Sequence, residues 1–156
     1  EMCIRDRWIV AINVTAANFG NASETFMVTL YYDNEVIATE TVYDLEPNMF
    51  LQLSFRWNTT NVPYCHNYTL RAVADKVPGE TNIDNNVFVD GWVEVKIMGD
   101  VNGDGKVNVL DCIHASAAFG ASPSEPRWNS LCDINKDGRI NILDLIMIAC
   151  NFGKHC

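Results

Sequence analysis

Two twelve-residue segments near the C-terminus carry the residue types of a metal-binding loop. The first reads Asp100-Val-Asn-Gly-Asp-Gly-Lys-Val-Asn-Val-Leu-Asp111, and the second reads Asp133-Ile-Asn-Lys-Asp-Gly-Arg-Ile-Asn-Ile-Leu-Asp144. Oxygen-bearing side chains recur at loop positions 1, 3, 5, 9 and 12, and position 6 is glycine in both. Calcium takes about six to eight hard oxygen ligands, and glycine permits the sharp turn that wraps a loop around the ion. The pattern predicts one calcium site in each loop.

The expected ligands follow from these positions. They are Asp100, Asn102, Asp104, Lys106, Asn108 and Asp111 in the first loop, and Asp133, Asn135, Asp137, Arg139, Asn141 and Asp144 in the second. Position 7 donates its backbone carbonyl, so the side chains of Lys106 and Arg139 are free. The apolar residues at position 8, Val107 and Ile140, are expected to pair across the two loops. Position 12 is Asp instead of the longer Glu of an EF-hand, so the following helix must start closer to the ion.

A helical period follows each loop, over 109–119 and 142–152. Each segment ends in Phe-Gly, and glycine is the usual left-handed stop just past a helix. No helical pattern precedes either loop, because an alternating pattern runs up to Ile97 and a linker with two prolines, 121–127, precedes the second loop. Each unit is therefore expected to be a loop followed by a helix, which is half of an EF-hand.

Two such half EF-hands at one register resemble the type I dockerin domain, over residues 98–156. The resemblance implies a small all-α domain that binds two calcium ions and docks a cohesin-like partner. Recognition residues of dockerins occupy positions 10, 11, 17 and 18, which here are Val109, Leu110, Ser116, Ala117, Ile142, Leu143, Ala149 and Cys150. The familiar pattern has Ser-Thr pairs at positions 10 and 11, whereas this chain has branched aliphatics. The alternative is that these aliphatics turn inward as core.

The first part of the chain, 7–97, alternates apolar and polar residues in short runs separated by turn residues. Short runs rich in Val, Thr, Tyr and Phe, with turn residues at frequent intervals, are typical of an antiparallel β-sandwich. The expected strands are 8–17, 24–33, 35–43, 49–57, 67–75 and 86–96.

This segment resembles the CARDB domain, an immunoglobulin-like module of bacterial and archaeal surface proteins. The matching stretches are Ile12–Gly20, Glu24–Tyr32, Leu53–Thr60, Tyr68–Asp75 and Pro78–Asn86. The resemblance implies a spacer or an adhesion module. In that family a strand precedes the segment that corresponds to 8–17. Here residues 1–6 resemble a translated sequencing adapter, so we expect them to be an artefact and the sandwich to be N-terminally truncated by one strand.

Composition excludes several function classes. The chain has 20 acidic and 11 basic residues and a net charge of −9, which argues against nucleic-acid binding. No apolar run approaches the length of roughly 18 residues that a spanning helix needs, so no membrane span is expected in this fragment. Zinc-finger spacing, a nucleophile elbow, a phosphate loop and a zincin helix are also missing from the sequence. We therefore expect no catalytic residue and no enzyme activity in these residues.

Six cysteines and four glycosylation sequons, at Asn13, Asn21, Asn58 and Asn67, indicate an extracellular or cell-surface glycoprotein. The disulfides are expected mainly within the tail. If the two helices pack antiparallel, Cys112 approaches Cys150 or Cys156, and Cys132 takes the remaining partner. Cys65 is then left unpaired or bound to a missing segment.

These expectations combine into a non-catalytic fragment of a secreted or cell-surface protein. A sandwich serves as spacer or adhesion module, and a calcium-dependent dockerin docks a cohesin-like partner. One alternative is a calcium-stapled structural cap with no partner. Another is the tail of a polysaccharide-degrading enzyme whose catalytic domain is missing, because dockerins often follow glycoside hydrolases.

Overall fold

The computed structural model describes residues 2–156, with side chains described from Ile4 onward. The chain folds as two compact units. The first contains Trp8–Asn61 and Asn67–Glu94, together with the start of the chain up to Ile4. The second contains Arg5–Arg7, Val62–His66 and Val95–Cys156. The second unit thus includes two short segments that lie outside the repeated tail in sequence.

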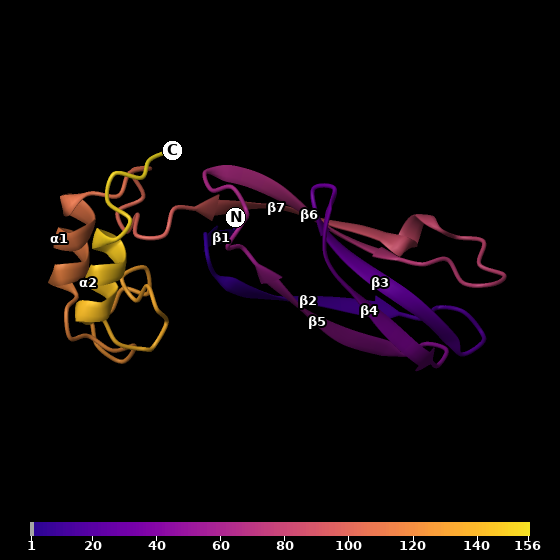
Figure 1. Ribbon diagram of the computed structural model, residues 1–156. Helices are drawn as coiled ribbons and strands as arrows, with labels where there is room; N and C mark the ends of the chain where they lie inside the picture. The colour runs from indigo at the N-terminus through magenta and orange to yellow at the C-terminus, as the bar shows by residue number, and fades with distance from the viewer. Residues whose placement is uncertain (1) are drawn as a thin grey trace. The chain divides into compact units, whose positions relative to one another are not determined.

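Strands make up the ordered part of the first unit (Figure 1). They are β1 Met2–Arg5, β2 Ile9–Ala17, β3 Glu24–Tyr32, β4 Glu35–Leu45, β5 Phe50–Asn58, β6 His66–Ala74 and β7 Val87–Lys96, with a short 3-10 helix, η1 Asp84–Asn86, before β7. The six expected strands are observed, with bounds within two residues of those predicted. Regular alternation of side-chain size and polarity over nine to eleven residues makes such strands legible in a sequence.

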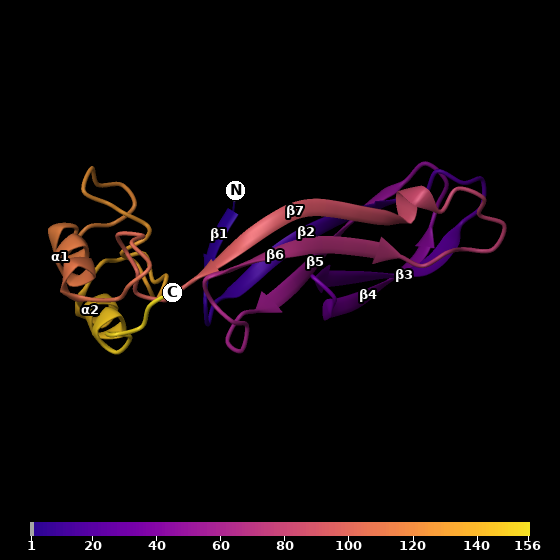
Figure 2. The same ribbon diagram turned by 90° about the horizontal axis from the view of Figure 1, so that it is seen from above.

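The strands form two sheets. One has the order β1-β7-β6-β3-β4, and the other contains β2 and β5 alone. β2 and β5 pair antiparallel along their full lengths, from Ile9 opposite Asn58 to Ala17 opposite Phe50. Figure 2 shows β7 and β6 passing over β2 and β5 as a separate layer. The expected all-β immunoglobulin-like architecture is therefore observed.

The core of the first unit lies between the two sheets. Val28, Leu30 and Val42 face inward from β3 and β4, and Leu53 and Phe55 meet them from β5. Alternate residues of β2, which are only half-buried, pack against the edge of this cluster. Burial of such side chains contributes about 1.5–3 kcal/mol each to folding, so this cluster holds the two sheets together.

A seventh strand, β1, lies in residues that the sequence led us to exclude. It is next to β7 at the edge of the larger sheet, and the backbone N–H of Asp6 donates to the carbonyl of Lys96 at 2.9 Å. That residues 1–6 are foreign remains a prediction, because pairing of a backbone depends little on which side chains it carries.

The second unit contains α1 Val109–Ala117 and α2 Ile142–Ala149, which lie side by side in Figures 1 and 2. Both start where predicted but end two to three residues earlier than expected. After each helix the backbone changes to hydrogen bonds between residues three apart, such as Phe119 N–H to Ser116 O and Phe152 N–H to Ala149 O. The glycine that follows each turn has a left-handed φ, 82° at Gly120 and 84° at Gly153, as predicted.

No helix in the described part of the chain is long and apolar enough to span a membrane.

Candidate calcium loops and partner face

The carboxylate at position 1 organises the first half of each loop. Asp100 and Asp133 are both buried. Asp100 Oδ2 accepts the backbone N–H of Gly105 at 3.0 Å, and Asp133 Oδ2 accepts that of Gly138 at 3.0 Å. Both glycines have a left-handed φ, 78° and 82°, which a residue with a Cβ rarely adopts. Position 6 therefore has the turn that the sequence predicted.

The carboxylate at position 12 closes each loop. Asp111 and Asp144 are fully buried, and each accepts three backbone N–H groups of its own loop, from positions 2, 3 and 9. The N–O distances are 2.8, 3.2 and 2.8 Å in the first loop and 2.7, 3.3 and 2.8 Å in the second. A buried carboxylate is tolerated because these N–H groups stabilise its charge.

Side chains at positions 3 and 5 contact each other. Asn102 Nδ2 donates to Asp104 at 3.0 Å, and Asn135 Nδ2 donates to Asp137 at 2.8 Å. In the second loop, Asn141 Nδ2 also reaches Asp137 at 3.3 Å. The hydrogen bond from Asn135 is the main cause that holds the pKa of the Asp137 carboxyl below its ordinary value. The second loop thus brings three of its expected ligands together.

Asparagine at position 9 caps the helix that follows. Asn108 Oδ1 accepts the N–H of Leu110, and Asn141 Oδ1 accepts the N–H of Leu143, each at 2.8 Å. With the position-12 aspartate bonded back to the asparagine backbone, each pair forms a capping box. The position-12 aspartate, the last expected ligand, is therefore also the third residue of the helix, so the helix begins inside the loop.

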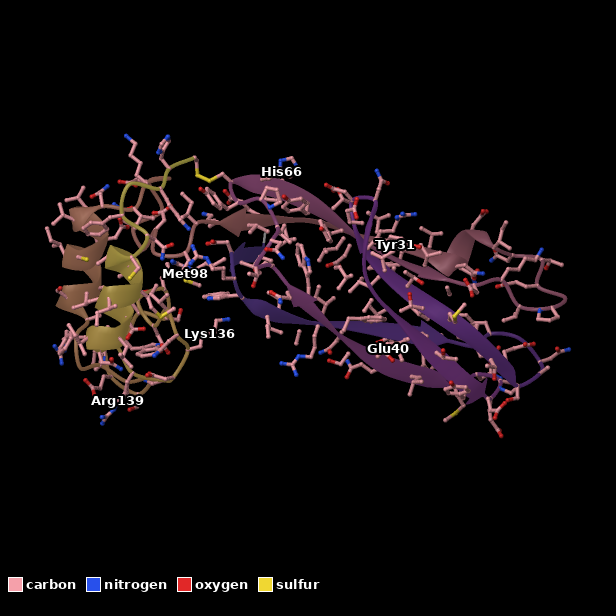
Figure 3. The ribbon with its side chains drawn as sticks, in the orientation of Figure 1. Tyr31, Glu40, His66, Met98, Lys136 and Arg139 are labelled. Carbon is pink, nitrogen blue, oxygen red and sulfur yellow. A yellow bond between two sulfur atoms is a disulfide. The ribbon has the colours of Figure 1, made fainter. Side chains whose placement is uncertain are left out.

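The donor set fits calcium, although the carboxylates alone do not form a cage. Among the side chains that the structure describes, from Ile4 onward, no three carboxylate, imidazole or thiol groups lie close enough together to hold one ion. The expected ligands include amide and backbone carbonyl oxygens as well as carboxylates, and hard oxygens of these kinds are calcium ligands. The side chains of Lys106 and Arg139 are exposed, as expected of position 7. Figure 3 shows Arg139 on the outer side of its loop.

The prediction that Val107 and Ile140 pair with each other is wrong. Val107 exchanges hydrogen bonds with the segment after α2: its N–H donates to Lys154 O at 2.9 Å, and its carbonyl accepts from Gly153 at 3.0 Å. Ile140 makes the equivalent pair with Gly120 and Ala121, the segment after α1, at 2.7 and 3.1 Å. Each loop is thus joined to the end of the other helix, an arrangement that depends on tertiary packing.

The two loops differ in residue type at position 4. It is Gly103 in the first loop and Lys136 in the second, and both have a left-handed φ, 76° and 59°. A lysine there is strained relative to glycine. Burial lowers the pKa of the Lys136 ammonium, and this loss of hydration is only partly offset by attraction to Asp133.

The expected partner residues are all exposed. They are Val109, Leu110, Ser116, Ala117, Ile142, Leu143, Ala149 and Cys150. The alternative that the aliphatics turn inward as core is therefore wrong. The core of the second unit includes instead Val107, Ala115, Ile140 and Ile148 of the loops and helices, which are at most 1% exposed.

Two further apolar residues, Ile113 and Ile146, were missed. They lie one turn along the helices from Leu110 and Leu143 and are 58% and 50% exposed. Their spacing of three from those leucines puts them on the same helix face, so helical periodicity was a sufficient signal. Together, Val109, Leu110, Ile113, Ile142, Leu143 and Ile146 form what we call the helix face.

The predicted disulfide pattern is wrong. Cys65 and Cys156 are bonded, with Cα atoms 5.5 Å apart, and Figure 3 shows this bond between the C-terminal tail and the segment before β6. Cys112, Cys132 and Cys150 are free. Segment 62–66 belongs to the second unit, which sequence alone did not indicate. Burial raises the pKa of the Cys112 and Cys132 thiols, and the side chain of Cys3 lies outside the described residues.

The four asparagines of the sequons, Asn13, Asn21, Asn58 and Asn67, are exposed. A transferase needs an accessible side chain, so each can serve as an acceptor. Their glycosylation remains a prediction.

Comparison with family models matches residues 7–90 to CARDB and residues 98–152 to the dockerin type I domain. No curated protein matches the chain. Among solved structures, the CARDB domain of the PF1109 protein from Pyrococcus furiosus, solved with di-metal ions, is 24% identical with a TM-score of 0.51; the match covers 60% of this chain and 78% of that one. This likeness shows the fold.

Two other solved structures are similar over larger or smaller spans. A domain named as part of a cell surface protein from Methanosarcina acetivorans is 27% identical with a TM-score of 0.49, covering 60% of this chain and 82% of that one. A type II cohesin–X–dockerin complex from Acetivibrio cellulolyticus is 17% identical with a TM-score of 0.35, covering 83% of each chain. The CARDB model covers more than half of the chain and the dockerin type I model matches residues 98–152, so the chain belongs to the CARDB family and carries a dockerin-like tail.

Proposed function

We propose that this chain is a non-catalytic part of a secreted or cell-surface protein, in which the tail binds two calcium ions and docks a cohesin-like domain. Both matched families are non-catalytic modules. The observation that carries the proposal is the exposed helix face. A small unit needs its apolar residues for its own core, so six large aliphatics left in solvent at repeated positions indicate a surface that a partner covers.

Calcium holds the two loops in shape. The first ion is bound by Asp100, Asn102, Asp104, Lys106, Asn108 and Asp111, and the second by Asp133, Asn135, Asp137, Arg139, Asn141 and Asp144. The bound ion neutralises carboxylates that otherwise repel one another at the start of a helix. Support comes from the oxygen donor set, the left-handed glycine at position 6 and the buried carboxylates at positions 1 and 12.

The helix face is duplicated. Val109, Leu110 and Ile113 of α1 correspond to Ile142, Leu143 and Ile146 of α2 by the same shift along the chain that relates the two loops. Two equivalent surfaces allow the tail to dock in either of two orientations. The flanking positions 17 and 18, Ser116 and Ala117 in one copy and Ala149 and Cys150 in the other, make the two copies similar but not identical.

The test is capture by purified cohesin domains after the pair of substitutions Leu110→Asp and Leu143→Asp. Each leucine is about half exposed, so the variant should fold and still bind calcium. Buried charge at the centre of an interface costs at least about 2 kcal/mol per site, so we expect capture to weaken about 100-fold or more. The matched control is Val36→Asp with Ile83→Asp, two exposed apolar positions of the first unit.

The outcomes separate the candidate functions. Loss of capture with calcium binding retained supports docking through the helix face. Loss of calcium binding in the leucine variant would show that these side chains maintain the loops, and would favour a stapled cap with no partner. The cap has its own support in the disulfide and the hydrogen bonds that join the C-terminal tail to the first loop.

The first unit serves as a spacer or adhesion module in this proposal. Its support is the match to CARDB over 7–90 and the sandwich core, which is independent of the tail residues. The sequons at Asn13, Asn21, Asn58 and Asn67 agree with exposure to a glycosylating, extracellular environment.

A further inference from the structure

Strand β2 has a free edge. It pairs with β5 on one side only, since the smaller sheet contains no other strand among the described residues. A free edge presents unpaired backbone N–H and C=O groups, which can pair with another extended segment. β4, at one edge of the larger sheet, lies close to β5, so the two sheets meet on that side. The open side of the sandwich is therefore the side of β2.

The β2 edge has none of the usual protection. Residues 8–23 contain no charged residue and no proline. Natural edge strands are blunted by lysine, proline, inward charges or bulges, because an open edge invites unwanted pairing. β4 follows that rule: it carries Glu35, Glu40 and Asp44, and its pairing with β3 is interrupted by register shifts. One edge strand of the sandwich, β4, is thus protected against pairing and another, β2, is not, which indicates that pairing at β2 is a function of this edge.

The larger sheet is uncovered next to this edge. A cavity of about 900 Å³ lies there, lined by Ile12 and Val14 of β2, Val28 and Leu30 of β3, and Leu70 and Ala72 of β6. Val28 and Leu30 are each 2% exposed, so the floor of the cavity is continuous with the core. Ile12 and Val14 remain half-buried, since nothing in the described chain covers them from the open side.

The length of the cavity and the state of the β2 backbone decide what it can hold. Its lining follows β2 from Ile12 to Ala17, about 20 Å at ~3.3 Å per residue. Over these residues β2 has a strand partner on one side only. An extended segment laid beside β2 gains backbone hydrogen bonds, whereas a helix uses its backbone groups within itself. The cavity therefore fits an extended strand.

The charged residues that line the cavity, which we call its rim, determine which kind of segment it attracts. Four acidic residues line the cavity, Glu24, Asp75, Glu80 and Asp90, against a single basic residue, Arg71. The guanidinium of Arg71 lies 4.6 Å from the centre of the Tyr31 ring, which engages part of its charge. A second copy of this chain, with a net charge of −9, would be repelled by such a rim. A basic segment would be attracted.

We propose that this groove binds an extended segment of another polypeptide, which adds to the free edge of β2 as a further strand. Alternate residues of the segment are small or branched apolar side chains that face Leu30 and Ala72. Lysine or arginine on either side of this run meets the acidic rim. Backbone pairing provides affinity, and the alternating side chains and the flanking charges provide selectivity.

The test uses the whole chain, produced without glycans, and the synthetic peptide Lys-Lys-Thr-Val-Thr-Val-Thr-Val-Thr-Lys-Lys. We expect it to protect from hydrogen exchange those β2 amides that pairing with β5 leaves free. Two control peptides should not bind: one with Glu in place of every Lys, and one with Pro in place of the central Val, which cannot extend the ladder.

A charge-reversed pair of variants checks the rim. Asp75→Lys with Asp90→Lys should weaken binding of the lysine peptide about tenfold at low salt. Glu35→Lys with Glu40→Lys, which makes the same change of net charge on β4 away from the cavity (Figure 3 labels Glu40), should leave binding unchanged. If both pairs of substitutions weakened peptide binding equally, the acidic residues of the cavity would not be the source of the selectivity. Protection located outside β2, or a concentration-dependent dimer that protects β2 without any peptide, would overturn the proposal itself.

Discussion

Asp100, Asp111, Asp133 and Asp144 are buried carboxylates, and each is hydrogen-bonded by backbone N–H groups of its own loop. Such groups tolerate burial only while these donors, or a cation, offset the loss of hydration. At the scale of single residues, the same carboxylate oxygens can therefore accept backbone N–H groups or bind a cation. We expect calcium to replace some of these contacts with metal–oxygen bonds and to leave the N–H bonds that shape the loop.

Substitution of a position-1 aspartate should abolish binding in its own loop and spare the other. For Asp133→Ala we expect the calcium affinity of the second site to fall at least about 100-fold. Substitution of residues that only contact a metal's ligands already lowers affinity about 10–100-fold. Asp100→Ala should do the same to the first site. Isothermal calorimetry with calcium measures both, with Asp84→Ala, a carboxylate of η1 in the first unit, as control. Two unchanged sites in either loop variant would refute the ligand assignment.

The three free thiols should differ in reactivity. Cys150 is exposed, Cys112 is intermediate and Cys132 is buried. Burial also raises the pKa of the Cys132 and Cys112 thiols, and only the thiolate reacts. With iodoacetamide at neutral pH, mass spectrometry should show labelling of Cys150 first, then Cys112, with Cys132 labelled only after unfolding. Raising the pH should accelerate Cys112 toward the rate of Cys150. Early labelling of Cys132 would contradict its burial.

At the scale of elements, the C-terminal residues 154–156 pair with the first loop and restrict its motion; we call this pairing the clasp. The N–H of Cys156 donates to the carbonyl of Gly105 at 2.9 Å, and His155 forms a β-bridge with Lys106. The Cys65–Cys156 disulfide then fixes the end of this tail. The second loop has the equivalent pairing at Ile140 but no disulfide. The repeat is therefore symmetric in sequence and asymmetric in how firmly each loop is held.

Removal of the disulfide should weaken the first calcium site more than the second. In the variant Cys65→Ser with Cys156→Ser, loop positions 6 and 7 must be ordered on binding. Fixing the backbone of one residue costs about 1–2 kcal/mol, so we expect a loss of about tenfold or more at the first site. Calcium titration followed by the NMR amide signals of Lys106 and Arg139 reports the two sites separately. Cys150→Ser, which leaves the disulfide intact, is the control. Equal weakening at both sites would show that the clasp is not specific to the first loop.

At the scale of the whole molecule, the two units draw their stability from different sources. The first has a core between two sheets, and the second has a small apolar core next to two loops that hold four buried carboxylates. Units of such small size depend on a metal or a disulfide, because they bury too little apolar surface to offset chain entropy.

Differential scanning calorimetry should therefore show two transitions, of which calcium moves one. At a concentration 1,000 times the dissociation constant, an ion adds about 4.1 kcal/mol per site. Each kcal/mol raises the melting temperature of a small domain by about 4–8 °C. The transition of the second unit should rise by at least about 15 °C relative to chelator, with a gain of helical circular dichroism, while that of the first stays fixed. The experiment is repeated with the disulfide reduced, since the bond limits how far the unit unfolds without metal. An ellipticity unaffected by chelator under both conditions would contradict calcium-dependent folding.

Local pattern was sufficient for most of the elements. Strands over nine to eleven residues follow from alternation, and the loops follow from oxygen donors at fixed spacing with glycine at position 6. The capping boxes at Asn108 and Asn141 were equally local, because an N-cap and its third residue are neighbours in sequence. These features depend on residues within about one turn or one strand of each other, where sequence spacing is close to spatial distance.

Contacts between distant segments needed the tertiary structure. The sequence could not pair Cys65 with Cys156, 91 residues away, because six cysteines leave many pairings open. Helical period placed Leu110 and Leu143 on one face of their helices, but whether that face is core or surface depends on what packs against it. The same holds for the pairing of Val107 with the segment after α2 and for the open edge of β2. Each depends on which segments meet in space, and a local pattern of residues carries no information about that.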